Sequence, residues 1–211
     1  GNTNTAVGYQ SSLSNTTVTL NASFGDNSFR CNTTGANNTG LGTSALFHNT
    51  TASFNTGVGS EALSTNTTGA NNVAVGRLAL KCNTTASDNT AVGFSALTAN
   101  TTGARNTAVG INALEVNTTG ADNTVLGSEA LKSNTTASNN VAIGYVALAL
   151  NTTGTNNVAV GAGALDANTT ADGNTAVGKT SLGTNTTGAN NTAVGLDLSL
   201  IHISEPTRRV L

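Results

Sequence analysis

Residues 100–116 read Asn-Thr-Thr-Gly-Ala-Arg-Asn-Thr-Ala-Val-Gly-Ile-Asn-Ala-Leu-Glu-Val, and close copies of this 17-residue unit fill almost the whole chain. Each copy begins with Asn-Thr-Thr, and no insertion separates one copy from the next. We number the unit from this first Asn as position 1. Position 7 is Asn and position 11 is Gly in all twelve copies, counting the incomplete first one. A period this regular indicates a stacked repeat architecture.

The composition favours a repetitive structural protein. Of 211 residues, 39 are Thr, 31 Asn and 24 Gly, while charged residues make up only 9% and the net charge is −2. No cluster of Lys and Arg is available to neutralise phosphates, which excludes a basic nucleic-acid binder. No apolar run is long enough to span a bilayer, and no signal peptide is visible.

The unit predicts strands rather than helices. Positions 4 and 5 tend to alternate Gly-Ala with Ala-Ser, so a two-unit period resembling that of tetratricopeptide helical pairs is superposed. Thr, Asn and Gly are poor helix formers, however. Positions 7–11 and 14–17 read as two short strands, separated by turn residues at positions 3–6 and 12–13. We therefore expect an all-β fold over residues 1–197, a parallel β-solenoid or β-roll of about twelve coils and roughly 55–60 Å long.

Charge placement predicts the interior. Before residue 198, every Asp, Glu, Lys and Arg falls at position 5, 6, 12, 13 or 16. Because unpaired charges are rarely buried, these positions should face solvent. Position 10, mostly Val, and position 15, mostly Leu, should form two interior stacks. On this register Val109→Asp should unfold several coils and Lys132→Asp should be nearly neutral.

Two columns of residues are candidate structural ladders. The Asn at position 7 can bond from coil to coil through its side-chain amide, or it can simply suit a turn, because Asn tolerates left-handed backbone. The ladder residues are Asn72, Asn89, Asn106, Asn123, Asn140 and Asn157, with Gly76, Gly93, Gly110 and Gly127 at position 11.

The outer face of the first strand predicts self-association. If Val at position 10 points inward, the outer face carries small residues such as Ala74 and Gly76. A solvated face is normally polar, so small apolar residues suggest that another copy of the chain packs there. The alternative is a lone solenoid with a flat, alanine-lined face.

The repeat resembles known surface fibres. Segments such as Asn72-Val73-Ala74-Val75-Gly76 and Asn140-Val141-Ala142-Ile143-Gly144 resemble the head repeats of trimeric autotransporter adhesins. The longer phrase Asn-Thr-Ala-Val-Gly-x-x-Ala-Leu-x-x-Asn-Thr-Thr-Gly is similar to repeats of bacteriophage tail fibres, and the resemblance covers residues 2–197. It implies a trimer of parallel β-rolls, carried outside the cell or on a virion.

Residues 198–211 break the repeat and contain the single proline, Pro206. The stretch Leu198–Arg208 resembles the translation of a transposase adapter used in preparing sequencing libraries, so the natural frame would end near Asp197. The alternative is a capping segment after the last coil. The repeat has no atypical unit at either end, and we expect a fragment of a longer array.

Residues that could carry chemistry are scattered. Cys31 and Cys82 are three coils apart, about 14 Å along the axis, too far for a disulfide within the chain. His48 and His202 have no convergent partner, and Ser60 and Ser128 have no His beside them. Asp recurs at position 6 only at Asp88 and Asp122, too rarely for a calcium-type repeat. Asp26, Glu61 and Glu115 form no catalytic pair in sequence. We expect no enzyme, catalytic residue, cofactor or metal site.

Each Asn-Thr-Thr is also a candidate N-glycosylation site, and these sites would line one edge of the rod. Asn21, Asn37 and Asn190 add further matches to the motif. The alternative is turn chemistry, because Asn and Thr bond their own backbone. The triplet residues are Asn15, Asn32, Asn49, Asn66, Asn83, Asn100, Asn117, Asn134, Asn151, Asn168 and Asn185.

The sequence thus favours a non-enzymatic extracellular fibre segment, a spacer or attachment rod with cell-surface glycans or a host receptor as candidate partners. Recognition would then lie at the variable positions 12, 13, 16 and 17. One alternative is a glycan-coated fibril built on the triplets. Another is an ice-binding solenoid, which favours Thr-x-Thr, whereas Thr101 and Thr102 are adjacent and would point apart in a strand.

Overall fold

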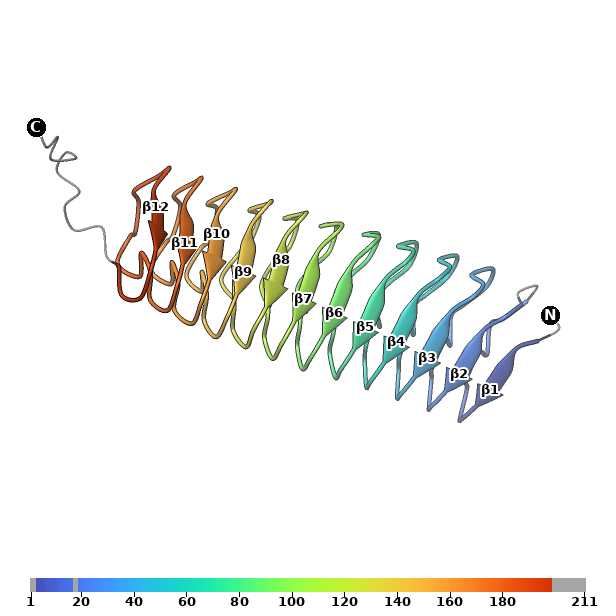
Figure 1. Ribbon diagram of the computed structural model, residues 1–211. Helices are drawn as coiled ribbons and strands as arrows, with labels where there is room; N and C mark the ends of the chain where they lie inside the picture. Colours follow the sequence, from blue (N-terminus) through green and yellow to red (C-terminus); the bar gives the residue numbers. More distant parts are fainter. Residues whose placement is uncertain (1–2, 17–18, 199–211) are drawn as a thin grey trace, which may run out of the picture.

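The computed structural model describes residues 3–16 and 19–198, and in them twelve strands form one parallel sheet in chain order. Each strand covers positions 8–10 of its coil. The strands lie side by side along a rod, with turns closing each coil behind them (Figure 1). They are β1 (Thr5–Val7), β2 (Ala22–Phe24), β3 (Thr39–Leu41), β4 (Thr56–Val58), β5 (Val73–Val75), β6 (Thr90–Val92), β7 (Thr107–Val109), β8 (Thr124–Leu126), β9 (Val141–Ile143), β10 (Val158–Val160), β11 (Thr175–Val177) and β12 (Thr192–Val194).

Every strand pairs in register with the strand one coil away. Thr90 pairs with Thr107 and Ala91 with Ala108, so equal positions of the unit stack on one another. Eleven steps of about 4.8 Å give a rod about 53 Å long between the first and last strands. The prediction of an all-β parallel solenoid with 17-residue coils is confirmed.

The prediction of a second strand at positions 14–17 is wrong: in the described residues each coil has one strand. Positions 13 and 15 have left-handed backbone, with φ of 54° at Asn112 and 53° at Leu114. These angles curl the chain instead of extending it. The segment still bonds along the axis, since the Leu114 N–H donates to the Ala130 carbonyl of the next coil at 3.0 Å. Each coil therefore contributes one strand and a hydrogen-bonded turn.

The predicted facing of the strand is also wrong. Ala108 at position 9 is fully buried, whereas Val109 at position 10 is only half-buried and lies on the outer face. The predicted leucine stack at position 15 is confirmed, with Leu97, Leu114 and Leu131 fully buried. Because the leucines fill the interior, the strand residue that faces them is in most coils no larger than alanine.

One coil shows this size constraint directly. Phe29 replaces leucine at position 15, and the next coil carries Gly40 at position 9. A Cβ atom on Gly40 would lie 2.5 Å from the Phe29 ring. The larger side chain is thus matched by a smaller one, and the core keeps its packing density.

The glycine at position 11 follows each strand and closes the turn. Gly110 has a φ of 138°, in a region that side chains rarely adopt, and a Cβ there would lie 2.5 Å from the Gly127 carbonyl oxygen. Both the backbone angle and the close approach of the next coil exclude any other residue. This accounts for the glycine in every copy.

The alternation of Gly-Ala and Ala-Ser at positions 4 and 5 corresponds to a contact between coils. The Ala121 N–H of a Gly-Ala coil donates to Oγ of Ser138 in the following Ala-Ser coil at 2.9 Å. Ala36 and Ser53 make the same contact at 3.0 Å. The bond joins a Gly-Ala coil to the Ala-Ser coil that follows it, in step with the two-unit period of the sequence.

Candidate functional site

The asparagines at position 7 form a ladder inside the rod. Asn106 donates its backbone N–H to Oδ1 of Asn89 at 2.9 Å, and its Nδ2 approaches the same oxygen at 3.3 Å. The Nδ2 also donates to the Gly120 carbonyl of the next coil at 2.9 Å. An amide can both donate and accept, so the column continues from coil to coil.

The asparagines of the Asn-Thr-Thr triplets form a second ladder. The Nδ2 of Asn117 donates to Oδ1 of Asn100 at 3.0 Å and to the Gly120 carbonyl at 2.9 Å. Gly120 thus accepts from both ladders, Asn106 in one and Asn117 in the other. The two columns together pair most of the polar groups of the interior, where unpaired groups are costly; among the described residues, Nδ2 of Asn174 is buried without a partner.

The triplet ladder bears on glycosylation. A glycan is attached through Nδ2, and in the interior coils this atom is buried and already donates hydrogen bonds. The folded rod therefore offers no free acceptor nitrogen at these residues, which argues against a glycan stripe built on them. The fully buried triplet residues are Asn49, Asn66, Asn83, Asn100, Asn117, Asn134, Asn151 and Asn168, and Asn32 is 1% exposed. Asn15 and Asn185 are partly exposed.

The two threonines of each triplet form two columns, one hydrogen-bonded to the next coil and one exposed to solvent. Thr101 at position 2 donates its hydroxyl to the Thr118 carbonyl of the next coil at 3.0 Å. Thr102 at position 3 is exposed. The adjacent threonines therefore differ in environment, and only position 3 presents a row of side chains to solvent.

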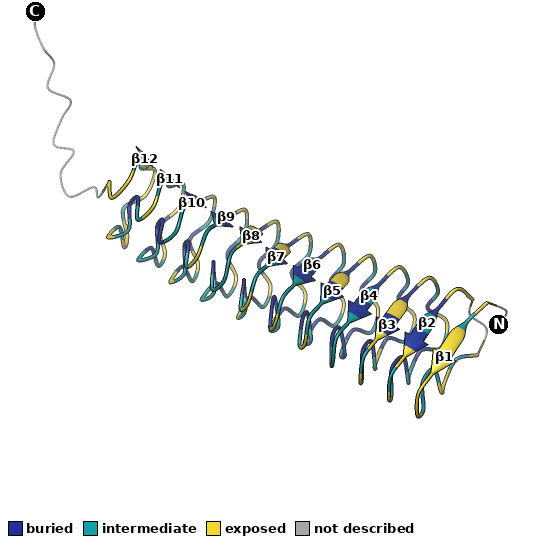
Figure 2. Ribbon diagram, turned by 60° about the horizontal axis from the view of Figure 1, so that its bottom comes forward, coloured by how far each residue is buried: buried dark blue, intermediate teal, exposed yellow. Residues whose placement is uncertain are grey.

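The outer face of the sheet is formed by positions 8 and 10 of the described coils. We call these two columns the sheet face. Position 10 is apolar in every coil; it is exposed in five coils, for example 48% at Leu41 and 50% at Leu126, and half-buried in the other seven. Position 8 is Thr, Val or Ala, so neither column carries a charge. Exposed segments recur on the strands along the rod (Figure 2).

The charged side chains lie on the surface, as their spacing predicts. Arg105 and Asp122, both at position 6, form a two-bond ion pair across neighbouring coils, with Nε–Oδ1 at 2.7 Å and Nη2–Oδ2 at 2.8 Å. Hydrogen bonding to Arg105 holds the pKa of the Asp122 carboxyl below its usual value. Exposed pairs of this kind contribute little to stability.

The other candidate residues do not converge. Cys31 and Cys82 are free thiols. Glu61 pairs with Lys81 at 2.7 Å, and Glu115 lies 3.8 Å from Lys132. Lys132 also lies 3.5 Å from Oε2 of Glu129, so these carboxylates lie beside a cation, and Glu115 and Glu129 share one. His202 lies outside the described residues, as does all but Leu198 of the stretch 198–211.

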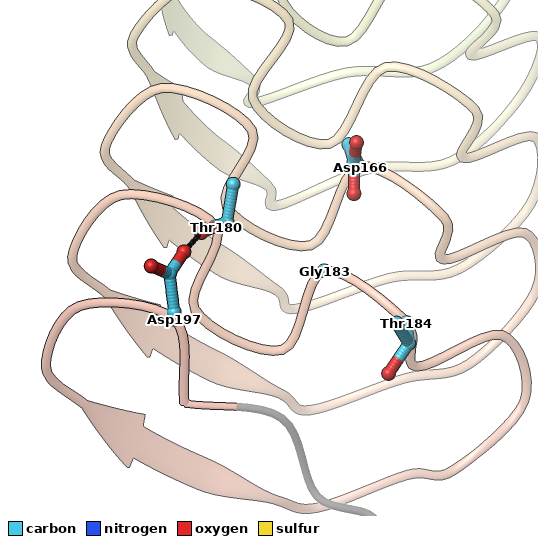
Figure 3. A pocket seen from close by; sticks show the side chains of 5 residues that line it. All are labelled: Asp166, Thr180, Gly183, Thr184 and Asp197. Atoms are coloured by element: carbon cyan, nitrogen blue, oxygen red, sulfur yellow. Dashed lines mark hydrogen bonds between the residues drawn. The ribbon is translucent and has the colours of Figure 1, made fainter.

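Two of the hollows on the described surface have a volume of about 320 Å³ each. The first lies at the last described coils, where Thr180 donates to Asp197 and Asp166 lies on the opposite wall (Figure 3). Burial raises the pKa of the Asp166 carboxyl. The second is lined by Ser44, Phe47, His48, Glu61, Ser64, Thr65 and Lys81.

Within the described coils, no group of three or more His, Cys, Asp or Glu residues is placed to hold a metal ion. The same residues contain no helix that could span a bilayer. No family model matches the chain, and no curated protein or solved structure is significantly similar to it.

Proposed function

We propose that this chain is a segment of a non-enzymatic extracellular fibre, used as a stiff spacer or attachment rod. The observation that supports it most is the unbroken 17-residue step, with equal positions paired by backbone and by two asparagine ladders. Such a rod gains length by adding identical coils, since each coil contacts mainly its neighbours. The extracellular setting rests on the resemblance to adhesin heads and tail fibres.

A deletion series tests the spacer role. Removing residues 66–99, two whole units, keeps the pairing of Gly-Ala and Ala-Ser coils and should shorten a folded rod by about 10 Å. Removing residues 66–90 places unlike positions over one another and should abolish folding. The lengths can be measured by small-angle X-ray scattering. Equal tolerance of both deletions would contradict a rod built on the 17-residue step.

The fibre is proposed to be a homo-oligomer, a trimer, joined through the sheet face. A charge-free strip about 53 Å long and about 10 Å wide offers on the order of 550 Å² per chain before the flanking side chains are added. Stable interfaces bury roughly 600–1,000 Å² per partner. A second copy presents the same 4.8 Å repeat, so its side chains can interdigitate along the whole length. Sedimentation equilibrium should give three chains, and a monomer at micromolar concentration would refute the assembly.

Ice binding is a second candidate function. The sheet face supports it, rather than the threonines of the Asn-Thr-Thr triplets. Thr at position 8 and Val at position 10, as in Thr107 and Val109, stand on the same side of the sheet, and six of the twelve strands carry this pair. A regular array of methyl and hydroxyl groups can order water. Thermal hysteresis in solution would support this function, and its absence would leave the fibre.

A further inference from the structure

We infer that the hollow around Ser64 is a binding site for a neutral saccharide, one hexose unit of a glycan. This inference rests on the proposed attachment role and names the chemistry of what is attached. The hollow arises from the sizes of the residues at position 16. That column runs Arg30, Phe47, Ser64, Lys81 over successive coils, and the short serine leaves a gap between two long neighbours.

The first wall of the hollow is aromatic. The Phe47 ring packs edge-on against His48, with centroids 4.6 Å apart and an interplanar angle of 67°. The guanidinium of Arg30 lies 5.6 Å from the centre of the same ring. Phe47 is therefore fixed between neighbours before any ligand arrives, which lowers the entropic cost of binding. A fixed aromatic ring is a good surface for the C–H groups of a sugar ring.

The opposite wall carries a donor and an acceptor side by side. Nζ of Lys81 lies 2.7 Å from Oε2 of Glu61, and both side chains are just over one-third exposed. Adjacent hydroxyls of a sugar can donate to the carboxylate and accept from the ammonium. The lining contains one positive and one negative charge, so it favours an uncharged ligand over an anion.

His48 adds a third polar group of defined tautomer. Its Nδ1 lies 3.0 Å from the Ser64 carbonyl oxygen. A carbonyl only accepts, so Nδ1 carries the hydrogen, and Nε2 of the neutral ring is left as an acceptor. Thr65 is occupied elsewhere, since its hydroxyl donates to the Lys81 carbonyl at 2.6 Å.

The hollow suits a small ligand and is separate from the sheet face. Its volume of about 320 Å³ is at the lower end of the range for ligand sites, so it holds one sugar residue while the rest of a glycan extends into solvent. None of its residues stands at position 8 or 10. Occupation of the hollow and assembly through the sheet face can therefore be tested independently.

The test is saturation-transfer NMR on the full chain with the methyl glycosides of glucose, galactose, mannose, N-acetylglucosamine and N-acetylneuraminic acid. At least one neutral glycoside should receive saturation and shift the His48 ring signals. Ser64→Gln should reduce the transfer at least fivefold by filling the hollow, and other coils already carry long side chains at position 16. Phe47→Ala should have a similar effect.

Phe94→Ala is the matched control, because Phe94 also packs under an arginine, Arg77 at 5.6 Å, but lies outside the hollow. It should bind like the unaltered chain. No transfer to any neutral glycoside, binding of the acidic glycoside alone, or undiminished binding by Ser64→Gln would each overturn the inference. Sedimentation and scattering of the same samples report on the fibre separately, so failure of the site is distinguishable from failure of the rod.

Discussion

Asn123 donates both its backbone N–H and its side-chain Nδ2–H to one atom, Oδ1 of Asn106 in the preceding coil, each at 3.0 Å. A single buried oxygen thus holds two donors of the next coil. The same side chain of Asn123 reaches forward to the Ala137 carbonyl at 3.0 Å. One residue type therefore connects three successive coils.

Replacing Asn106 by alanine should destabilise the rod by about 2–4 kcal/mol, because it leaves buried donors of Asn123 without their acceptor. Urea unfolding followed by circular dichroism measures the change. Thr102→Ala is the control, since Thr102 is exposed, and it should change the stability by less than about 0.5 kcal/mol. Equal effects of the two substitutions would show that the ladder contributes little.

Ala108→Asp and Val109→Asp test the facing of the strand. Ala108 is fully buried, so its substitution by a charged residue should cost about 3 kcal/mol or more and unfold neighbouring coils. Val109 lies on the sheet face, and Val109→Asp should keep the thermal transition of the isolated chain.

Val109→Asp should instead weaken the proposed assembly, because it places a charge in an apolar interface. Circular dichroism and sedimentation equilibrium on both variants separate the two effects. If Val109→Asp unfolds the chain while Ala108→Asp does not, the facing described for β7 is incorrect.

Gly110→Ala should cost about 3 kcal/mol or more, since the residue needs a φ that favours glycine and a Cβ would meet the next backbone at 2.5 Å. Gly163→Asn is the control. Gly163 has a φ of 67° at position 13, where Asn112 has a φ of 54°, so this change should stay within about 1 kcal/mol. Thermal melts that rank the two variants in the opposite order would contradict this account of position 11.

The Asp166 carboxyl gives a pH-dependent prediction. Burial raises its pKa, so folding favours the protonated form, and the charged form costs stability once the pH has risen above the ordinary carboxyl value, about 3.9. Asp166→Asn should therefore melt at a slightly higher temperature at pH 7. The difference should disappear as the pH is lowered below that ordinary value. If Asp166→Asn instead melts at a lower temperature than the unaltered chain at pH 7, with no such difference at pH 3, the carboxylate is stabilising and the prediction is wrong.

Much of the architecture follows from the sequence because the repeat is so regular. A constant 17-residue step leaves stacking in register as the only way to bury the same positions in every coil, and the absence of charge at positions 14 and 15 identifies Ala113 and Leu114 as interior. The second strand could not be predicted correctly. An Ala-Leu pair reads as extended, and nothing in the local pattern shows that Leu114 adopts a left-handed φ of 53°.

The facing of the strand depends on volume rather than on hydrophobicity. Ala108 and Val109 are both apolar and point to opposite faces of the strand. The sequence alone therefore allows either residue to face the interior, and it favours the larger one. The tertiary structure decides for alanine, because the leucines at position 15 occupy the interior and in most coils leave room for a methyl group or less. The pair Phe29 and Gly40 shows the same compensation within one pair of coils.

The sequence by itself determined the coil length, the parallel stacking, the leucine stack and the surface placement of the charges, since all of these depend on periodicity and on the cost of burying charge. Only the tertiary structure decided which face of the strand is apolar and exposed, how the two asparagine columns share the position-4 carbonyls, and where a small residue opens a hollow. These features depend on which side chains of neighbouring coils come into contact. The volumes of those side chains and the geometry of their hydrogen bonds determine the contacts once the coils have stacked.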